Sequence, residues 1–152
     1  MTANEKIELI AINIRYAIEK TLRERLPITF HDFPFGACGD TALILGRHLK
    51  DLGYGGFKYV LACRGDKEDG SWCSHVWLER QGLIVDITAD QFSDFSHKVF
   101  VGMGSSFHST FTVEDVSDAD YEIYDSNTYE KLMSAHQEIL KQLDECGDGD
   151  NI

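Results

Sequence analysis

Apolar residues recur every three or four positions near both ends of the chain and alternate with polar residues in its middle. The first apolar stripe consists of Ile7, Ile10, Ile14, Ile18 and Leu22. Because a helix brings such positions onto one face, the spacing predicts a helix over residues 3–25. Thr2 and Glu5 have the form of a capping box at its start, and Pro27 helps to end it.

Two further helices are predicted by the same periodicity. The second stripe consists of Cys38, Ala42, Leu45, Leu49 and Leu52, and the third of Tyr129, Leu132, His136, Ile139 and Leu143. The second helix therefore covers residues 38–52, with Gly53 suited to its C-terminal cap and Cys38 in its first turn on the core-facing side. Asn127 and Glu130 have the spacing of a cap for the last helix.

The middle of the chain is predicted to form strands. Alternation and turn residues place them at residues 57–63, 73–80, 83–88, 98–101 and 107–113. Helices flanking an antiparallel sheet indicate an α+β fold. We expect one domain over residues 1–145, followed by a flexible acidic tail at 146–152.

Composition and charge limit the partners that this fold is expected to have. A net charge of −12 argues against nucleic acid and anionic membrane surfaces. No apolar run approaches the roughly 18 residues that span a bilayer, and the N-terminus lacks the pattern of a signal peptide. The four cysteines show no disulfide framework. We therefore expect a cytoplasmic protein, although delivery by a specialised secretion route would leave no sign in the sequence.

Cys38 has the setting of a catalytic thiol. A first-turn cysteine lies at the positive end of the helix dipole, where free backbone amides stabilise a thiolate. Gly36 and Gly39 keep bulk away from it, and its own amide is a natural donor to an oxyanion. The alternative is a structural cysteine at the end of a core stripe, because free cysteines are often buried.

His75 and Asp86 complete the pattern of a catalytic triad if the hairpin between them has the right register. A two-residue loop at Gln81-Gly82 would pair Arg80 with Leu83, so that His75 and Asp86 point to the same face as diagonal neighbours. A three-residue loop would turn Asp86 to the opposite face. A carboxylate inside an apolar strand needs a partner, and His75 is the candidate; the alternative is a bond to nearby amides or to Thr88.

These motifs together resemble the transglutaminase-like core, which belongs to the papain-like cysteine hydrolases. The resemblance is carried by Gly36-Ala37-Cys38, His75-Val76-Trp77 and Asp86-Ile87-Thr88, within about residues 34–92. Relatives often have Asp-Pro-Thr as the third motif, and Ile87 here replaces the proline. The resemblance implies a papain-like fold, with the catalytic cysteine at a helix N-terminus packed on an antiparallel sheet and with extra N- and C-terminal helices. It also implies acyl chemistry through a thioester.

Several other residues are candidates for the substrate cleft or for supporting roles. Trp77 would share a face with His75 and shield its bond to Asp86, and Gln91 could reach the substrate. Asp32, like its neighbour His31, could line the cleft or assist the oxyanion, although a polar turn is the simpler interpretation. Gly36 would leave room for a substrate carbonyl.

The remaining histidines and cysteines give weaker signals. Cys63, Cys73 and His75 could suggest zinc, but a fourth ligand is not evident. His48 is predicted to face solvent, and the other histidines without a partner pattern are assigned to the surface or the core edge: His97, His108 and His136. The acidic stretch 114–125 is predicted to be a solvated surface.

The sequence therefore predicts a cysteine hydrolase or acyltransferase that needs no cofactor and no metal. Cys38 would attack a carbonyl, His75 would act as base and then acid, and Asp86 would orient His75. The acyl group would pass to water, as in a protease, amidase or deamidase, or to an amine, as in transglutaminase-type transfer. The substrate would be a protein, a peptide or a small amide or acyl compound. A non-catalytic protein-binding module on the same fold is the alternative; the oligomeric state is left open.

Overall fold

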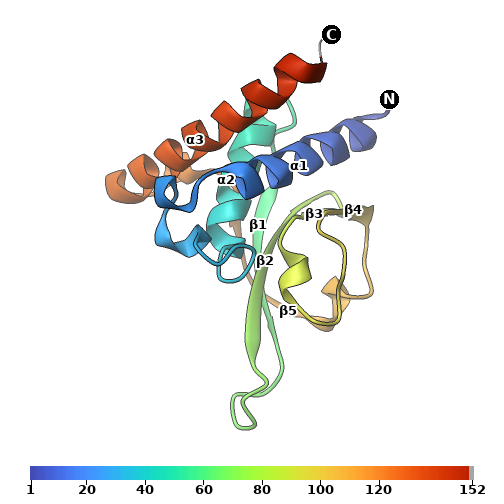
Figure 1. Cartoon of the computed structure of the whole chain (residues 1–152). Helices are drawn as coiled ribbons and strands as arrows, with labels where there is room; N and C mark the ends of the chain where they lie inside the picture. Colours follow the sequence, from blue (N-terminus) through green and yellow to red (C-terminus); the bar gives the residue numbers. More distant parts are fainter. Residues whose placement is uncertain (151–152) are drawn as a thin grey trace.

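The computed structural model describes residues 1–150 of the chain, with side chains up to residue 143. Its three helices are α1 (Ala3–Lys20), α2 (Cys38–Asp51) and α3 (Ser126–Asp150). Figure 1 shows the helices gathered on one side of the molecule, with a long hairpin projecting away from them. The predicted α+β class is confirmed.

Five antiparallel strands form one sheet with the order β4-β3-β2-β1-β5. The strands are β1 (Lys58–Arg64), β2 (Cys73–Arg80), β3 (Leu83–Asp86), β4 (Phe100–Met103) and β5 (Thr112–Asp118). The prediction of a strand over 107–113 was wrong in its placement, because a 3-10 turn at His108–Thr110 precedes β5. The acidic stretch is an exposed edge strand as far as Asp118, but Ala119, Asp120 and Tyr121 beyond it are buried, so the prediction of a solvated surface is only partly correct.

Helix α2 confirms the predicted start at Cys38, and Gly53 follows it with a positive φ of 93°, the conformation that favours glycine after a helix. Helix α1 confirms the cap, since the Thr2 hydroxyl accepts the Glu5 amide. It ends earlier than predicted, however. The Thr21 hydroxyl donates to the Ala17 carbonyl and Thr21 itself is extended, so residues 23–25 form a separate 3-10 turn.

Each face of the sheet contacts its own apolar core. The larger core fills the space between the helices and the sheet, and includes Ile14, Leu45, Leu78 and Val85. The smaller core lies on the opposite face, where β1 and β2 pack against the segment that links β3 to β5. Its buried residues are Val60, Ala62, Trp77, Ile84, Ala89, Phe107 and Phe111. The two cores place apolar surroundings on both sides of strand β2.

The hairpin between β2 and β3 has the predicted two-residue loop. Arg80 pairs with Leu83 and Leu78 with Val85. Gln81 and Gly82 have φ values of 51° and 84°, which fits a type I′ turn. The pairing of the two strands ends at Leu78 and Val85, so β3 leaves β2 before it reaches His75. The register confirms that odd-numbered β2 residues share a face with Ile84 and Asp86.

A second buried group lies between α2 and α3. Nδ1 of His48 is 3.2 Å from Nε2 of His136, and the Tyr121 hydroxyl is 2.9 Å from Nδ1 of His136. The prediction that His48 faces solvent is wrong, because α3 and the turn at Tyr121–Ile123 cover that side of α2. We call these three side chains the helical histidine cluster.

The predicted tail, residues 146–152, lies beyond the last described side chain, so both the tail and the domain boundary stay predictions. Within the described part of the chain, no helix combines the length and the apolar character needed to cross a membrane.

Candidate active site

Cys38 is the first residue of α2 and is half-buried. The residue before it, Ala37, provides no side-chain cap, so no neighbouring side chain occupies the amides of the first turn. Gly36 has a φ of 73° and open space where a side chain would be. Its conformation favours glycine and leaves the approach to the thiol clear.

Tyr59 of β1 is a neighbour of Cys38 that the sequence did not reveal. A side chain at Gly39 would lie 3.0 Å from the Tyr59 hydroxyl, so the glycine lets the helix start approach this ring. Burial, and then the negative charge of Cys38, raise the pKa of Tyr59 to about 12. The hydroxyl therefore keeps its proton at neutral pH and can donate a hydrogen bond beside the thiol.

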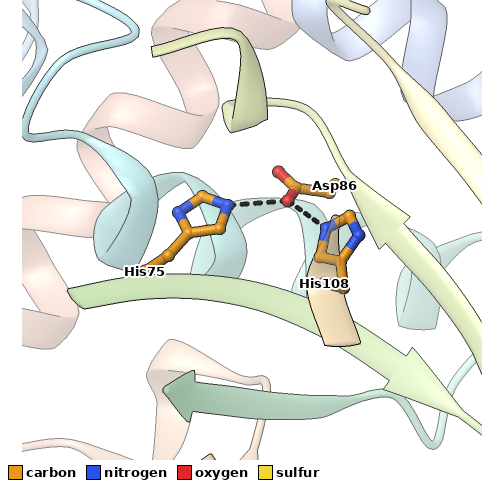
Figure 2. A group of neighbouring side chains, drawn as sticks. All are labelled: His75, Asp86 and His108. Carbon is orange, nitrogen blue, oxygen red and sulfur yellow. Dashed lines mark hydrogen bonds and ion pairs between the residues drawn. The ribbon is translucent and has the colours of Figure 1, made fainter. Parts of the chain in front are cut away.

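His75 and Asp86 form the central contact of the site. Nε2 of His75 lies 2.7 Å from Oδ2 of Asp86, as Figure 2 shows, and both side chains are almost fully buried. A carboxylate only accepts hydrogen bonds, so Nε2 of His75 carries the proton and donates it. Nδ1 is therefore the nitrogen that takes up or gives off the second proton of the ring.

The charge of Asp86 determines how His75 titrates. Burial by itself would lower the pKa of His75, but the Asp86 charge and hydrogen bond, followed by those of Cys38, raise it to about 9. Burial would likewise raise the pKa of Asp86, but His75 and His108 hold it far below its usual range. The carboxylate is therefore ionised, and His75 is protonated at neutral pH.

Nδ1 of His75 lies on the side of the ring away from Asp86. Nε2 of Gln91, in the 3-10 turn Ala89–Gln91, lies 3.3 Å from it. Cys38 borders the same small cavity as Asp86, and its charge and hydrogen bonding also raise the pKa of His75. The structure thus brings together Cys38, His75, Asp86 and Gln91, four residues that the sequence selected.

His108 is a further member of the site, and the prediction that it lies at the surface or the core edge is wrong. Its Nε2 is 2.7 Å from the same Asp86 oxygen that His75 contacts, and its ring is 3% exposed. The ring stacks edge-on against Trp77, 4.8 Å between centroids. Its sequence neighbourhood has no periodicity that could have revealed this contact.

Arg15 of α1 fixes the segment that follows Asp86. Its Nη1 donates to the Ile87 carbonyl, and its two Nη atoms hold both Asp90 oxygens at 2.7 and 2.9 Å. Such a bidentate pair restricts orientation as well as distance. Because Arg15 is 5% exposed, it anchors the stretch from Asp86 to Gln91 firmly to the first helix.

Aromatic side chains enclose His75. Trp77 lies 5.8 Å from its ring and Phe92 lies 5.0 Å away, edge-on. Phe107 and Phe111 complete the enclosure. Trp77 packs beside the imidazole as expected, and the aromatic wall keeps water from the His75–Asp86 bond, where a low dielectric strengthens the interaction.

Asp32 lies in an exposed turn, where its backbone carbonyl accepts the Phe35 amide. This matches the simpler interpretation of a polar turn. Around Cys38 the structure offers only a small cavity of about 10 Å³, bounded in part by Thr41 and Val76. A hollow of about 620 Å³ lies elsewhere, over Lys58, Arg80 and Val116.

The cysteine-based zinc site suggested by the sequence is not formed among the described side chains. Cys63 and Cys73 occupy opposite faces of the sheet, because Cys63 pairs with Ser74 and Cys73 pairs with Arg64. His75, Asp86 and His108 do offer three possible metal-binding atoms within 4.8 Å of one another. Their nitrogens contact Oδ2 directly at hydrogen-bonding distance, and their burial leaves no open position of the kind that catalytic metals use.

No family model matches the sequence, and neither a curated protein nor a solved structure matches the chain.

Proposed function

We propose that the protein is a cysteine-dependent acyl-transfer enzyme of the transglutaminase-like or papain-like kind, most simply one that hydrolyses an amide or peptide bond. The observation that carries the proposal is the directed bond from Nε2 of His75 to buried Asp86, with Gln91 beside Nδ1 and with Cys38 bordering the same small cavity as Asp86. This is the arrangement that general-base activation of a thiol requires.

The reaction follows from these contacts. At neutral pH Nδ1 of His75 already holds the proton taken from the thiol, as an imidazolium beside a thiolate, and the thiolate of Cys38 attacks the substrate carbonyl carbon. The carbonyl oxygen becomes an oxyanion, stabilised by the Cys38 amide and the side-chain amide of Gln91. The carbon–nitrogen bond then breaks, and Nδ1 returns its proton to the leaving amine. Water attacks the resulting thioester, with His75 again as base, and releases the acid.

Transfer to an amine shares every step up to the thioester. The two outcomes differ only in the nucleophile that attacks it, and His75 would deprotonate either one. Trapping with hydroxylamine distinguishes a thioester that accepts amines from one that excludes them. The polar Gln91 and the open side of Cys38 permit both.

Alkylation by iodoacetamide tests the proposal without knowledge of the substrate. We expect Cys38 to react faster than a free thiol at pH 7, and His75→Ala to slow it by about tenfold or more. Mapping by mass spectrometry provides an internal control in Cys63, whose pKa is raised by its hydrogen bond to Glu114 and which should react slowly. A Cys38 rate equal to that of a free thiol would reject the proposal.

Metal analysis separates this enzyme from a metal centre built on the same buried side chains. Under our proposal the purified protein carries less than stoichiometric zinc, and chelation leaves the labelling of Cys38 unchanged. Stoichiometric metal that is lost in Asp86→Ala would support the metal centre instead.

A further inference from the structure

Asp86 accepts more hydrogen bonds than the single one from a histidine that a catalytic triad requires. Oδ1 accepts the Thr88 amide at 3.0 Å, and Oδ2 accepts both His75 and His108 at 2.7 Å. Figure 2 shows the two rings reaching the same oxygen from either side. The side chain is 2% exposed, so water does not supply these bonds.

We propose that His108 is a positioning residue that holds Asp86 ionised and in the orientation that His75 requires; this inference rests on the proposed function. Rotation of the carboxylate about its own bond would carry Oδ2 away from His75. The Thr88 amide fixes Oδ1 but leaves Oδ2 free. His108 fixes Oδ2 independently of His75, whose ring changes charge as Nδ1 loses and regains a proton during the reaction.

The surroundings of His108 determine which of its nitrogens donates. The Ser105 hydroxyl lies 2.7 Å from Nδ1 and also accepts the His108 backbone amide at 3.1 Å. Because the Asp86 carboxylate only accepts hydrogen bonds, Nε2 of His108 carries the ring proton and donates it. In the neutral ring Nδ1 then accepts the Ser105 hydroxyl proton. Phe100 and Phe107 contact the ring and restrict its rotation.

The test compares two substitutions of His108 with a matched change in the helical histidine cluster. H108L removes the donor, and H108Q keeps an amide donor near the position of Nε2. H136L makes the same change at another buried histidine. We expect the pH 7 alkylation rate of Cys38 to fall about tenfold in H108L and less than about threefold in H108Q, as for partners that orient a reacting group. H136L should leave the rate unchanged.

Proton NMR of the His75 Nε2 proton distinguishes a positioning role from a purely structural one. A purely structural role would not change this proton in H108L and restore it in H108Q. In folded H108L, the His75 Nε2 proton should resonate further upfield and exchange faster with water, and H108Q should restore it. A folded H108L with the wild-type rate, or a higher one, would overturn the inference. If H108L does not fold, Ser105→Ala decides: we expect about a threefold lower rate, and an unchanged rate would overturn it.

These outcomes separate the inference from the proposed function. If wild-type Cys38 reacts like a free thiol, the proposed function fails, and with it the role assigned to His108. If wild-type Cys38 is activated and H108L retains that activation, only the role of His108 is rejected. Thermal unfolding of H108L and H136L shows whether the two variants are comparably destabilised.

Discussion

The molecule buries two groups of histidines, and they titrate in opposite directions. In the active site, the charge of Asp86 overcomes burial and raises the pKa of His75 to about 9. In the helical histidine cluster, burial first and then the charge of His48 lower the pKa of His136 to about 4. His75 and His136 are 0% and 3% exposed. Burial is therefore nearly equal, and the buried partner determines the sign.

The partners explain why one group suits chemistry and the other suits packing. His136 contacts another histidine and a phenol and no carboxylate among the described side chains, so its uncharged form is favoured at neutral pH. His75 contacts a carboxylate, which raises its pKa, so it can hold a proton between steps of a reaction. A buried histidine marks a reactive site only when a carboxylate directs it.

Removing that carboxylate should have the largest effect. Asp86→Asn leaves the donors of His75 and His108 without a charged acceptor. We expect Cys38 alkylation at pH 7 to slow about a hundredfold, since an opposite charge at this distance shifts a pKa by 1–3. The free energy of unfolding should fall by about 3 kcal/mol, measured by urea denaturation.

Asp120→Asn is the matched control for this change. Asp120 is also a buried carboxylate, but it accepts Lys50 and Arg47 beside the helical histidine cluster. It should destabilise the protein and leave Cys38 alkylation at the wild-type rate. Equal slowing in both variants would show that the loss in Asp86→Asn reflects stability rather than chemistry.

Alkaline pH should weaken the active-site group. Since the pKa of His75 is raised from 6.5 to about 9 on folding, its contribution is fully present below pH 6.5 and is lost as pH rises through 9. We expect this residue to account for a loss of about 3 kcal/mol in unfolding free energy across that range. Asp86→Asn should flatten this limb of the urea-denaturation profile; a limb of unchanged slope would contradict the assignment.

Acidic pH should weaken the helical group instead. The pKa of His136 is lowered to about 4, so the unfolded chain binds more protons between pH 6.5 and 4. Unfolding free energy should therefore decrease as pH falls through this window, by about 2 kcal/mol at pH 5. His136→Gln should reduce the slope of the acid limb without altering the alkaline one, which denaturation at several pH values will show.

Tyr121→Phe should have the smallest effect. It removes the hydroxyl that contacts Nδ1 of His136 and retains the ring. We expect a loss of about 1 kcal/mol of stability by thermal unfolding, with Cys38 alkylation unchanged. A change in alkylation would indicate coupling between two groups that share helix α2, at whose opposite ends they lie.

The sequence predicts what depends on local geometry. The helix start at Cys38 follows from its glycines and apolar stripe, and the shared face of His75 and Asp86 follows from a two-residue turn. His108 could not be predicted, because its contact with Asp86 spans 22 residues and a segment without periodicity. His48 was misassigned because residues of one helix do not reveal that a second helix will cover it.

The turn at Gln81-Gly82 also has an evolutionary consequence. One inserted residue would still permit a hairpin, because the two strands could pair in a register shifted by one residue. It would, however, present Asp86 to the wrong side of the sheet, away from His75. Under the proposed function, the length of this loop is therefore information about reactivity. Insertion of one codon would separate a folded domain from a competent one, while every candidate catalytic residue remains in the sequence.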